Sequence, residues 1–136
     1  MLEPGSVAPA YQTSGSAGVD LCSNEAFELA PLQRRIVGTG LRVAIPFGFE
    51  GQVRPRSGLA ARHGLGMVNS PGTIDSDYRG EIKLILINLG GEPMAVTKGE
   101  RVAQLVICPV VQVRFEPVED LESTSRGEGG FGSTGR

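Results

Sequence analysis

The chain has few of the residues that build metal centres. Among its 136 residues there is no tryptophan, one histidine (His63) and two cysteines, with no cluster of Cys and His. A structural zinc ion takes four ligands, which are mostly Cys and His side chains. We therefore expect no zinc centre, and we expect His63 to play a structural part in a short helix.

The two cysteines stand far apart in the sequence, Cys22 in the run "VDLCS" and Cys108 in the run "QLVICPV". Cysteine is often buried among apolar residues, and thiols stay reduced in the cytosol. We expect two buried free thiols, with a single disulfide as the alternative.

An excess of charge of one sign is also absent. The chain has 13 Lys and Arg residues against 15 Asp and Glu residues, for a formal net charge of −2. Proteins that bind nucleic acid through their overall field are strongly basic. We expect no nucleic-acid partner, and any polyanionic ligand must be bound by a few well-placed cations.

Long apolar runs are missing too. No segment approaches the roughly 20 apolar residues of a membrane span. Residues 1–18 lack the charged and then apolar stretches of a signal peptide. We expect no membrane partner and a cytoplasmic protein.

The chain is instead rich in turn-forming residues. Its 20 glycines and 9 prolines are spread between short runs of Val, Ile and Leu, a pattern that predicts an all-β barrel or sandwich. Only 57–64, "SGLAARHG", reads as a helix, with Ser57 as N-cap and Gly64 as the stop. The run 82–88, "IKLILIN", is nearly all apolar, so we expect it to be covered on both faces. We expect one domain over 1–120 and a mobile Gly-rich arm over 121–136.

Two stretches have the composition of a phosphate site or of a general base. In "RPRSGLA", 54–60, Arg56 precedes the start of the short helix, where free N–H groups and a guanidinium can bind phosphate oxygens. In "NSPGTIDSDYRGEIK", 69–83, turn signals flank "TID" and predict a β-hairpin. Asp75 could there be a sheltered general base beside Tyr78. The alternatives are a capped surface helix and ordinary turn residues.

Three further stretches place polar groups where they need a partner or a ligand. Asp20 lies in the apolar strand of "AGVDLCS", and Gln104 lies in the strand after the turn of "KGERVAQLV". The tail "RGEGGFGSTG" has only two large side chains, Arg126 for a phosphate and Phe131 for a planar base. The alternatives are an intramolecular ion pair for Asp20, an outward-facing polar position for Gln104 and a disordered, solubilising end for the tail.

Taken together and in this order, the five stretches resemble the five motifs of the trimeric dUTPases of bacterial type, the deoxyuridine triphosphate nucleotidohydrolases. The resemblance covers most of the chain, from Ala17 to the end. It implies a jelly-roll-like, β-clip barrel subunit with one short helix. It also implies a homotrimer with active sites at the subunit interfaces and a C-terminal arm that closes over a site.

The resemblance further implies hydrolysis of dUTP to dUMP and pyrophosphate. That reaction keeps uracil out of DNA and supplies dUMP for dTMP synthesis. Asp75 would activate water for attack on the α-phosphate, and Arg126 would add a late cation. Mg²⁺ would be carried mainly on the triphosphate, with Asp20 holding it through water.

By the same resemblance, the uracil pocket lies over Asn69 to Lys83. Tyr78 would exclude a 2′-hydroxyl and Phe131 would cover the base. The substrate-binding residues implied in this way are Arg56, Ser57, Gly58, Asn69, Thr73, Ile74, Asp75, Tyr78, Lys83, Gln104, Arg126, Phe131, Gly132, Ser133 and Thr134. Lys98, Glu100 and Arg101 are expected to shape a turn and a subunit contact.

Three rival functions remain open from the sequence. The first is the related dCTP deaminase, which shares the fold. The second is a nucleotide-binding regulatory trimer without catalysis, and the third is a structural β-barrel without a ligand. The "TIDSDYRG" stretch and the complete tail favour the hydrolase.

Overall fold

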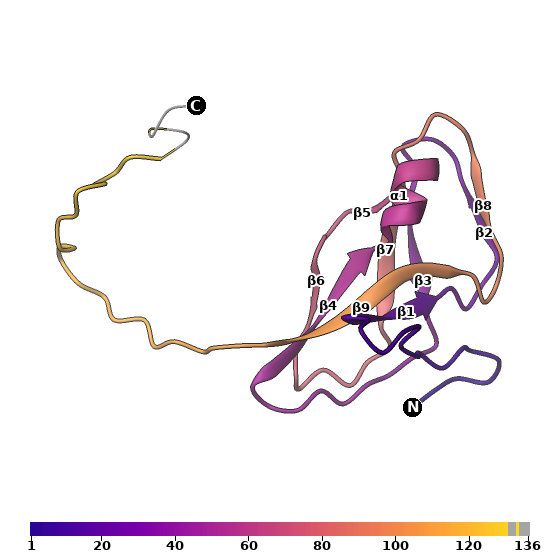
Figure 1. Ribbon diagram of the computed structural model, residues 1–136, viewed down its shortest axis with the longest axis horizontal. Helices are drawn as coiled ribbons and strands as arrows, with labels where there is room; N and C mark the ends of the chain where they lie inside the picture. The colour runs from indigo at the N-terminus through magenta and orange to yellow at the C-terminus, as the bar shows by residue number, and fades with distance from the viewer. Residues whose placement is uncertain (131–132, 134–136) are drawn as a thin grey trace.

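Nine strands and one short helix form the body of the computed structural model, which describes residues 1–130 and 133. Figure 1 shows this body with an extended tail leading away from it. The elements in chain order are β1 (Gly18–Cys22), β2 (Phe27–Leu29), β3 (Arg34–Gly38), β4 (Phe49–Pro55), α1 (Ser57–His63), β5 (Leu65–Met67), β6 (Gly72–Ile74), β7 (Lys83–Asn88), β8 (Met94–Val96) and β9 (Arg101–Pro109).

The strands form three small antiparallel sheets. Their orders are β1-β9-β4-β6, β2-β8 and β3-β7-β5. Most neighbours in a sheet are far apart in the chain, as with β1 beside β9. The all-β prediction with a single short helix is therefore confirmed.

The four-stranded sheet places the polar residues of three motifs side by side. Asp20 on β1 and Arg54 on β4 both lie opposite Gln104 on the central strand β9. Because side chains alternate along a strand, these residues share one face, while Val53 and Leu105 point to the other face and are buried. One face of the sheet thus closes the core and the other presents polar groups.

The core is aliphatic and is drawn from all three sheets. Its fully buried members include Leu29, Val37, Ile82, Leu84 and Leu86, each with no exposed surface. The prediction that the run 82–88 is covered on both faces is wrong for one face: Leu84 and Leu86 are buried in the core, whereas Ile85 and Ile87 on the opposite face are only partly buried. Strand β7 is covered completely only where it faces the core.

The short helix begins one residue earlier than expected. Arg56, not Ser57, is the N-cap, and it makes no side-chain capping bond; Ser57 is the first helical residue. Gly64 ends the helix as predicted, with φ 69° in the left-handed region that glycine favours. The N-cap prediction was wrong because Arg56 keeps the extended backbone of a cap and Ser57 already lies inside the first turn. Ser57 lines a cavity beside the helix start.

The predicted hairpin over 69–83 is also wrong. Strand β6 pairs with β4, whereas β7 pairs with β3 and β5, so the two strands belong to different sheets. A turn closed by the Tyr78 N–H bond to the Asp75 carbonyl oxygen (3.2 Å) lies in the segment between them. The turn signals were read correctly, but tertiary packing gave each strand a distant partner.

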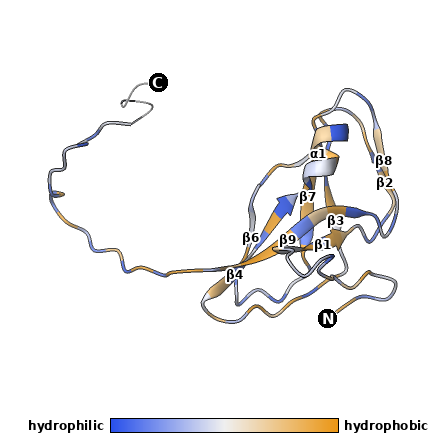
Figure 2. Cartoon of the chain, viewed as in Figure 1, coloured by the Kyte–Doolittle hydropathy of each residue, from blue (hydrophilic) through white to orange (hydrophobic). Residues whose placement is uncertain are grey.

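The chain leaves the body after β9. The Val110 N–H donates to the Gly48 carbonyl oxygen at 2.9 Å, and the described residues from 111 onward bond only to one another. Figure 2 shows apolar and polar residues interspersed along this tail, and Val111, Val113 and Phe115 are exposed. The division into a domain over 1–120 and an arm over 121–136 stays a prediction.

Candidate active site

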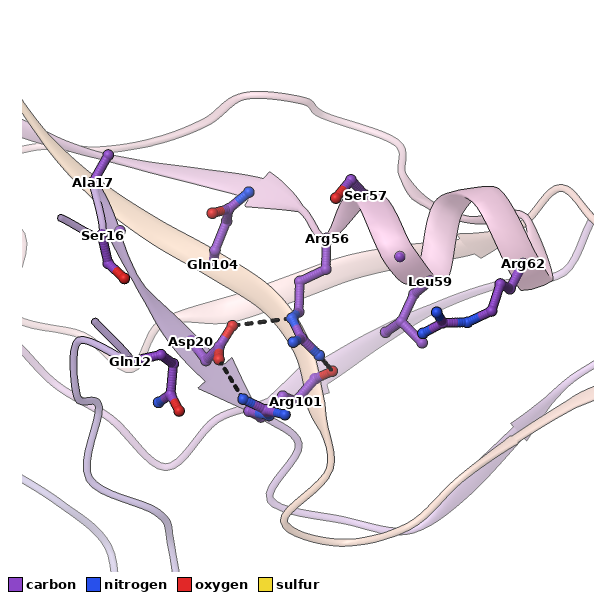
Figure 3. Close-up of a pocket in the computed structure, with 12 residues that line it drawn as sticks. Gln12, Ser16, Ala17, Asp20, Arg56, Ser57, Leu59, Arg62, Arg101 and Gln104 are labelled. Carbon is purple, nitrogen blue, oxygen red and sulfur yellow. Dashed lines mark hydrogen bonds and ion pairs between the residues drawn. The ribbon is translucent and has the colours of Figure 1, made fainter. Parts of the chain in front are cut away.

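A cavity of about 460 Å³ opens beside the start of α1, on the polar face of the four-stranded sheet. We call it the arginine cavity. Figure 3 shows its side chains converging from β1, β9, α1 and the N-terminal segment. Its lining residues are Gln12, Ser16, Ala17, Gly18, Asp20, Arg56, Ser57, Gly58, Leu59, Arg62, Arg101 and Gln104.

Asp20 is held between two arginines. Its Oδ1 lies 3.0 Å from Nε of Arg56, and its Oδ2 lies 3.0 Å from Nη1 of Arg101. The Asp20 side chain is only 14% exposed. A half-buried carboxylate requires such partners, because losing water without them is costly. The ion-pair interpretation of Asp20 is therefore confirmed, and the pair lies inside the cavity.

Two further hydrogen bonds fix the wall of the cavity. Arg56 donates through Nη1 to the carbonyl oxygen of Arg101 at 2.9 Å, and Gln104 donates through Nε2 to the carbonyl oxygen of Pro55 at 3.0 Å. One bond joins β9 to Arg56 at the entrance of α1, and the other joins β9 to Pro55 at the end of β4. The structure thus brings together the motif residues Asp20, Arg56 and Gln104.

The sequence assigned no part in a ligand site to four polar residues that line this cavity: Gln12, Ser16, Arg62 and Arg101. Gln12 and Ser16 belong to a segment in which the sequence showed no functional pattern, and a Thr13–Ser16 turn orders it. Arg101 was assigned to the turn before β9. Arg101 reaches the cavity because it is the first residue of β9, which pairs with β1. The sequence alone does not show this pairing, so it gave no signal for Arg101.

A second, smaller cavity of about 240 Å³ lies along β6. We call it the β6 pocket. Six of the predicted substrate-binding residues line it, together with Val53, Met67, Gly72 and Glu81; the six are Asn69, Thr73, Ile74, Asp75, Tyr78 and Lys83. The structure therefore groups these six residues, as the third motif suggested.

The two cavities are separate within one subunit, since no residue lines both. Asp75 is exposed, so the sheltered place expected for a general base does not exist in the described part of a single chain. The shelter was inferred from the apolar Ile74 beside it, but β6 ends at Ile74 and Asp75 begins the turn that follows.

The tail residues lie apart from both cavities. Arg126 bonds through Nε to the carbonyl oxygen of Gly129 at 2.7 Å, a contact within the tail, and Ser133 makes a local turn to Gly130. Phe131, Gly132 and Thr134 fall outside the described residues. In this conformation the tail contributes no group to either cavity from residues 110–130.

The cysteines are free thiols, as predicted. Cys22 is buried and Cys108 is partly buried. Desolvation, and then the negative charge of Asp20, raise the pKa of the Cys22 thiol above its usual value. Burial and the raised pKa therefore both disfavour the thiolate form of Cys22.

No helix within the described residues is long and apolar enough to cross a membrane. The same part of the chain has no group of three or more His, Cys, Asp and Glu residues that could hold a metal ion.

Comparison with known proteins identifies the family of this chain. The family model described as dUTPase matches residues 6–135. The deoxyuridine 5′-triphosphate nucleotidohydrolase of Anaeromyxobacter sp. (strain Fw109-5) is 62% identical over 94% of this chain and 87% of its own length. The enzyme of the same name from Wolinella succinogenes is 54% identical over 99% of this chain and 91% of its own length.

Solved structures agree in fold. The Staphylococcus bacteriophage 80alpha dUTPase with dUPNHPP superposes with a TM-score of 0.91 at 29% identity, covering 100% of this chain and 96% of its own. Its G164S mutant, solved with dUpNHpp, also has a TM-score of 0.91, at 28% identity over 99% of this chain and 95% of its own. With a family match that spans 6–135 and two relatives above half identity, the chain belongs to the dUTPase family.

Proposed function

We propose that this protein hydrolyses dUTP to dUMP and pyrophosphate, removing dUTP from the pool used for DNA synthesis and supplying dUMP for dTMP synthesis. The observation that carries this proposal is the pair of cavities: a cationic one at a helix start and a smaller one lined by the third motif. The relatives named as deoxyuridine 5′-triphosphate nucleotidohydrolases support it over nearly the full chain.

The arginine cavity binds the triphosphate in this proposal. Arg56 offers the N–H groups that Asp20 and the Arg101 carbonyl leave free, and the Ser57 hydroxyl and Gly58 lie beside it at the helix start. Gln104 is held at the cavity wall by its bond to Pro55. Phosphoryl transfer depends mainly on positioning and charge neutralisation, and these residues supply both.

Asp75 is the general base in this proposal. It would take a proton from the water that attacks the α-phosphorus in line, with pyrophosphate leaving on the opposite side. Arg126 would come from the arm to stabilise charge on the leaving phosphates, and Ser133, with Phe131, Gly132 and Thr134, would close over the nucleotide. Asp75 is exposed in one chain, so this role requires that bound substrate and the closed arm shield it from bulk solvent while the attacking water stays beside it.

The donor set fits a hydrated Mg²⁺ that arrives on the triphosphate. Asp20 is the only carboxylate that lines the arginine cavity among the described residues, and both of its oxygens already accept bonds from arginines. Mg²⁺ keeps most of its waters and is often bound by one or two carboxylates and substrate phosphates. Asp20 would hold it through water. When bound, the ion neutralises phosphate charge.

Selection of the nucleotide falls to the β6 pocket. Uracil and cytosine differ in donors and acceptors along one edge, so the wrong base leaves buried polar groups unpaired. Asn69, Thr73 and Ile74 line the pocket for the base, with Lys83 at its wall. Tyr78 would lie against the deoxyribose and leave no room for a 2′-hydroxyl.

A complete site needs more than one subunit. Asp75 and the arginine cavity share no wall in one chain, so we propose a homotrimer in which the β6 pocket of one subunit faces the arginine cavity of another. The arm, over 121–136, would extend from the domain over 1–120 to such a site.

The test of function is pyrophosphate release with Mg²⁺ from dUTP, dCTP, dTTP and UTP at equal concentration. Release from dUTP alone is expected. Similar release from several nucleotides would contradict the assignment of the β6 pocket. Ammonia from dCTP would identify a deaminase, and tight dUTP binding without release would identify a regulatory trimer.

Subunit sharing has its own test. Asp75→Asn and Arg56→Gln should each be inactive as pure proteins. If a site draws these residues from different subunits, unfolding and refolding the two together should restore part of the activity, because some mixed trimers carry one intact site. No recovery in mixed trimers of proven composition would place both residues in the same chain's site.

A further inference from the structure

We infer that Arg101 is a positioning residue of the triphosphate site, holding both Asp20 and Arg56 in the geometry that phosphate binding needs. This inference rests on the proposed function. Arg101 begins β9, whose pairing with β1 runs through Asp20 opposite Gln104. Its side chain therefore reaches across to the neighbouring strand and into the arginine cavity, as Figure 3 shows.

The first contact is between side chains. Nη1 of Arg101 lies 3.0 Å from Oδ2 of Asp20, and Nε of Arg56 lies 3.0 Å from the other oxygen, Oδ1. One oxygen is thus assigned to each guanidinium. Without Arg101, Arg56 could take both oxygens, since a guanidinium and a carboxylate pair readily in a two-bond geometry. Arg56 would then be drawn towards Asp20 and away from the ligand.

The second contact is through the backbone. The carbonyl oxygen of Arg101 accepts a bond from Nη1 of Arg56 at 2.9 Å. Arg56 is therefore fixed at two points, by Asp20 at Nε and by Arg101 at Nη1. A guanidinium carries five N–H donors in a rigid plane, so two fixed bonds set the direction of the remaining three.

The turn before β9 does not need the Arg101 side chain. The Glu100 carboxylate accepts from the Thr97 N–H at 2.9 Å and from the Thr97 hydroxyl at 3.2 Å. Gly99, with φ 86°, supplies the left-handed residue. The described contacts of the Arg101 side chain are with Asp20 instead, so the expected role in shaping this turn falls to Glu100.

The chain offers a matched control. Arg35 on β3 pairs with Glu25 at 2.9 Å, and its side chain is 44% exposed against 48% for Arg101. Both are strand arginines paired with a carboxylate, at 2.9 Å for Arg35 and 3.0 Å for Arg101, but Arg35 lines neither the arginine cavity nor the β6 pocket. Arg35→Met therefore removes an ion pair of the same kind away from the site.

The experiment measures binding of dUpNHpp and of dUMP by calorimetry to the full chain, as wild type, Arg101→Met, Arg101→Lys and Arg35→Met. We expect Arg101→Met to weaken dUpNHpp about 10-fold or more, equivalent to about 1.4 kcal/mol. Its affinity for dUMP should change less than about 2-fold, since dUMP lacks the β- and γ-phosphates. Arg101→Lys should recover part of the loss, because a lysine supplies charge to Asp20 without the planar fork.

Three outcomes would overturn the inference. Equal loss of both ligands in Arg101→Met would show a general structural defect, and an unchanged dUpNHpp affinity would show no positioning role. Loss of the same size in Arg35→Met would show that any removed ion pair suffices. The wild-type protein distinguishes failure of this inference from failure of the proposed function. If the wild type binds dUpNHpp no better than dUMP and releases no pyrophosphate, the proposed function itself fails.

Discussion

The hydroxyl of Tyr78 donates a hydrogen bond to the carbonyl oxygen of Glu81 at 2.9 Å. This bond spans Gly80 and folds the phenol ring over its backbone, where a Cβ on Gly80 would overlap the ring. Tyr78 is thus held against the β6 pocket by a local bond and by the absence of a side chain two residues later. The position of the Tyr78 ring therefore depends on a glycine.

Replacing Gly80 with alanine should therefore displace Tyr78 and relax discrimination against ribose. We expect the ratio of kcat/KM for dUTP over UTP to fall about 10-fold, equivalent to about 1.4 kcal/mol of selectivity. Gly91→Ala is the control, because a Cβ there meets nothing within 4 Å. An unchanged ratio in Gly80→Ala would mean that Tyr78 does not exclude the 2′-hydroxyl.

Replacing Asp75 with asparagine should remove the proposed general base while keeping the shape of the side chain. We expect kcat to fall by about 10²- to 10⁴-fold, with dUpNHpp affinity nearly unchanged. Asp77→Asn, two residues on and also exposed, is the matched control and should keep most activity. Single-turnover rates with dUTP measure both; equal losses in the two variants would indicate a general charge effect.

Replacing Asn88 with alanine should cost stability rather than chemistry. This fully buried side chain donates to the Leu29 and Glu92 carbonyl oxygens at 2.9 and 2.8 Å and accepts from the Gly90 N–H at 2.8 Å. Leaving these groups unpaired should lower the free energy of unfolding by about 2–4 kcal/mol. Urea unfolding at fixed protein concentration measures it. A loss no larger than that of Leu89→Ala, at an exposed neighbour, would contradict the prediction.

Removing residues 127–136 should abolish turnover and leave the body folded. The described tail residues beyond Val110 bond only among themselves, so the body loses no hydrogen bond to that described part of the tail. We expect pyrophosphate release to fall about 100-fold or more while the thermal unfolding temperature and the oligomeric mass stay the same. A change of mass in the truncated protein would show that the arm also holds subunits together.

Cys22 should be unreactive in the native protein and should couple folding to alkaline pH. Burial raises its thiol pKa above the ordinary 9.0, so the folded state disfavours the thiolate. The stability from this group is complete below pH 9 and is lost as pH rises through the folded pKa. In a Cys108→Ser background, iodoacetamide should label Cys22 far more slowly in native protein than in guanidinium. Similar rates would contradict the burial.

Much of the fold could be predicted because it depends on local pattern. Short Val, Ile and Leu runs between glycines and prolines predicted the strands, and Gly64 predicted the helix end. The pairing of these strands could not be predicted in this way. The segment over 69–83 looked like a hairpin, yet β6 and β7 lie in different sheets because each gains more from packing against distant strands.

The candidate site divides along the same line. The sequence by itself determined which side chains are available: Asp20, Arg56, Gln104 and Asp75 stand in the motifs from which we propose a triphosphate site and a base. Only the tertiary structure decided which of these side chains contact one another. The pairing of β1 with β9 places Arg101 beside Asp20, 81 positions away in the chain. Contacts at that separation depend on how the whole core packs, and no local pattern contains that information.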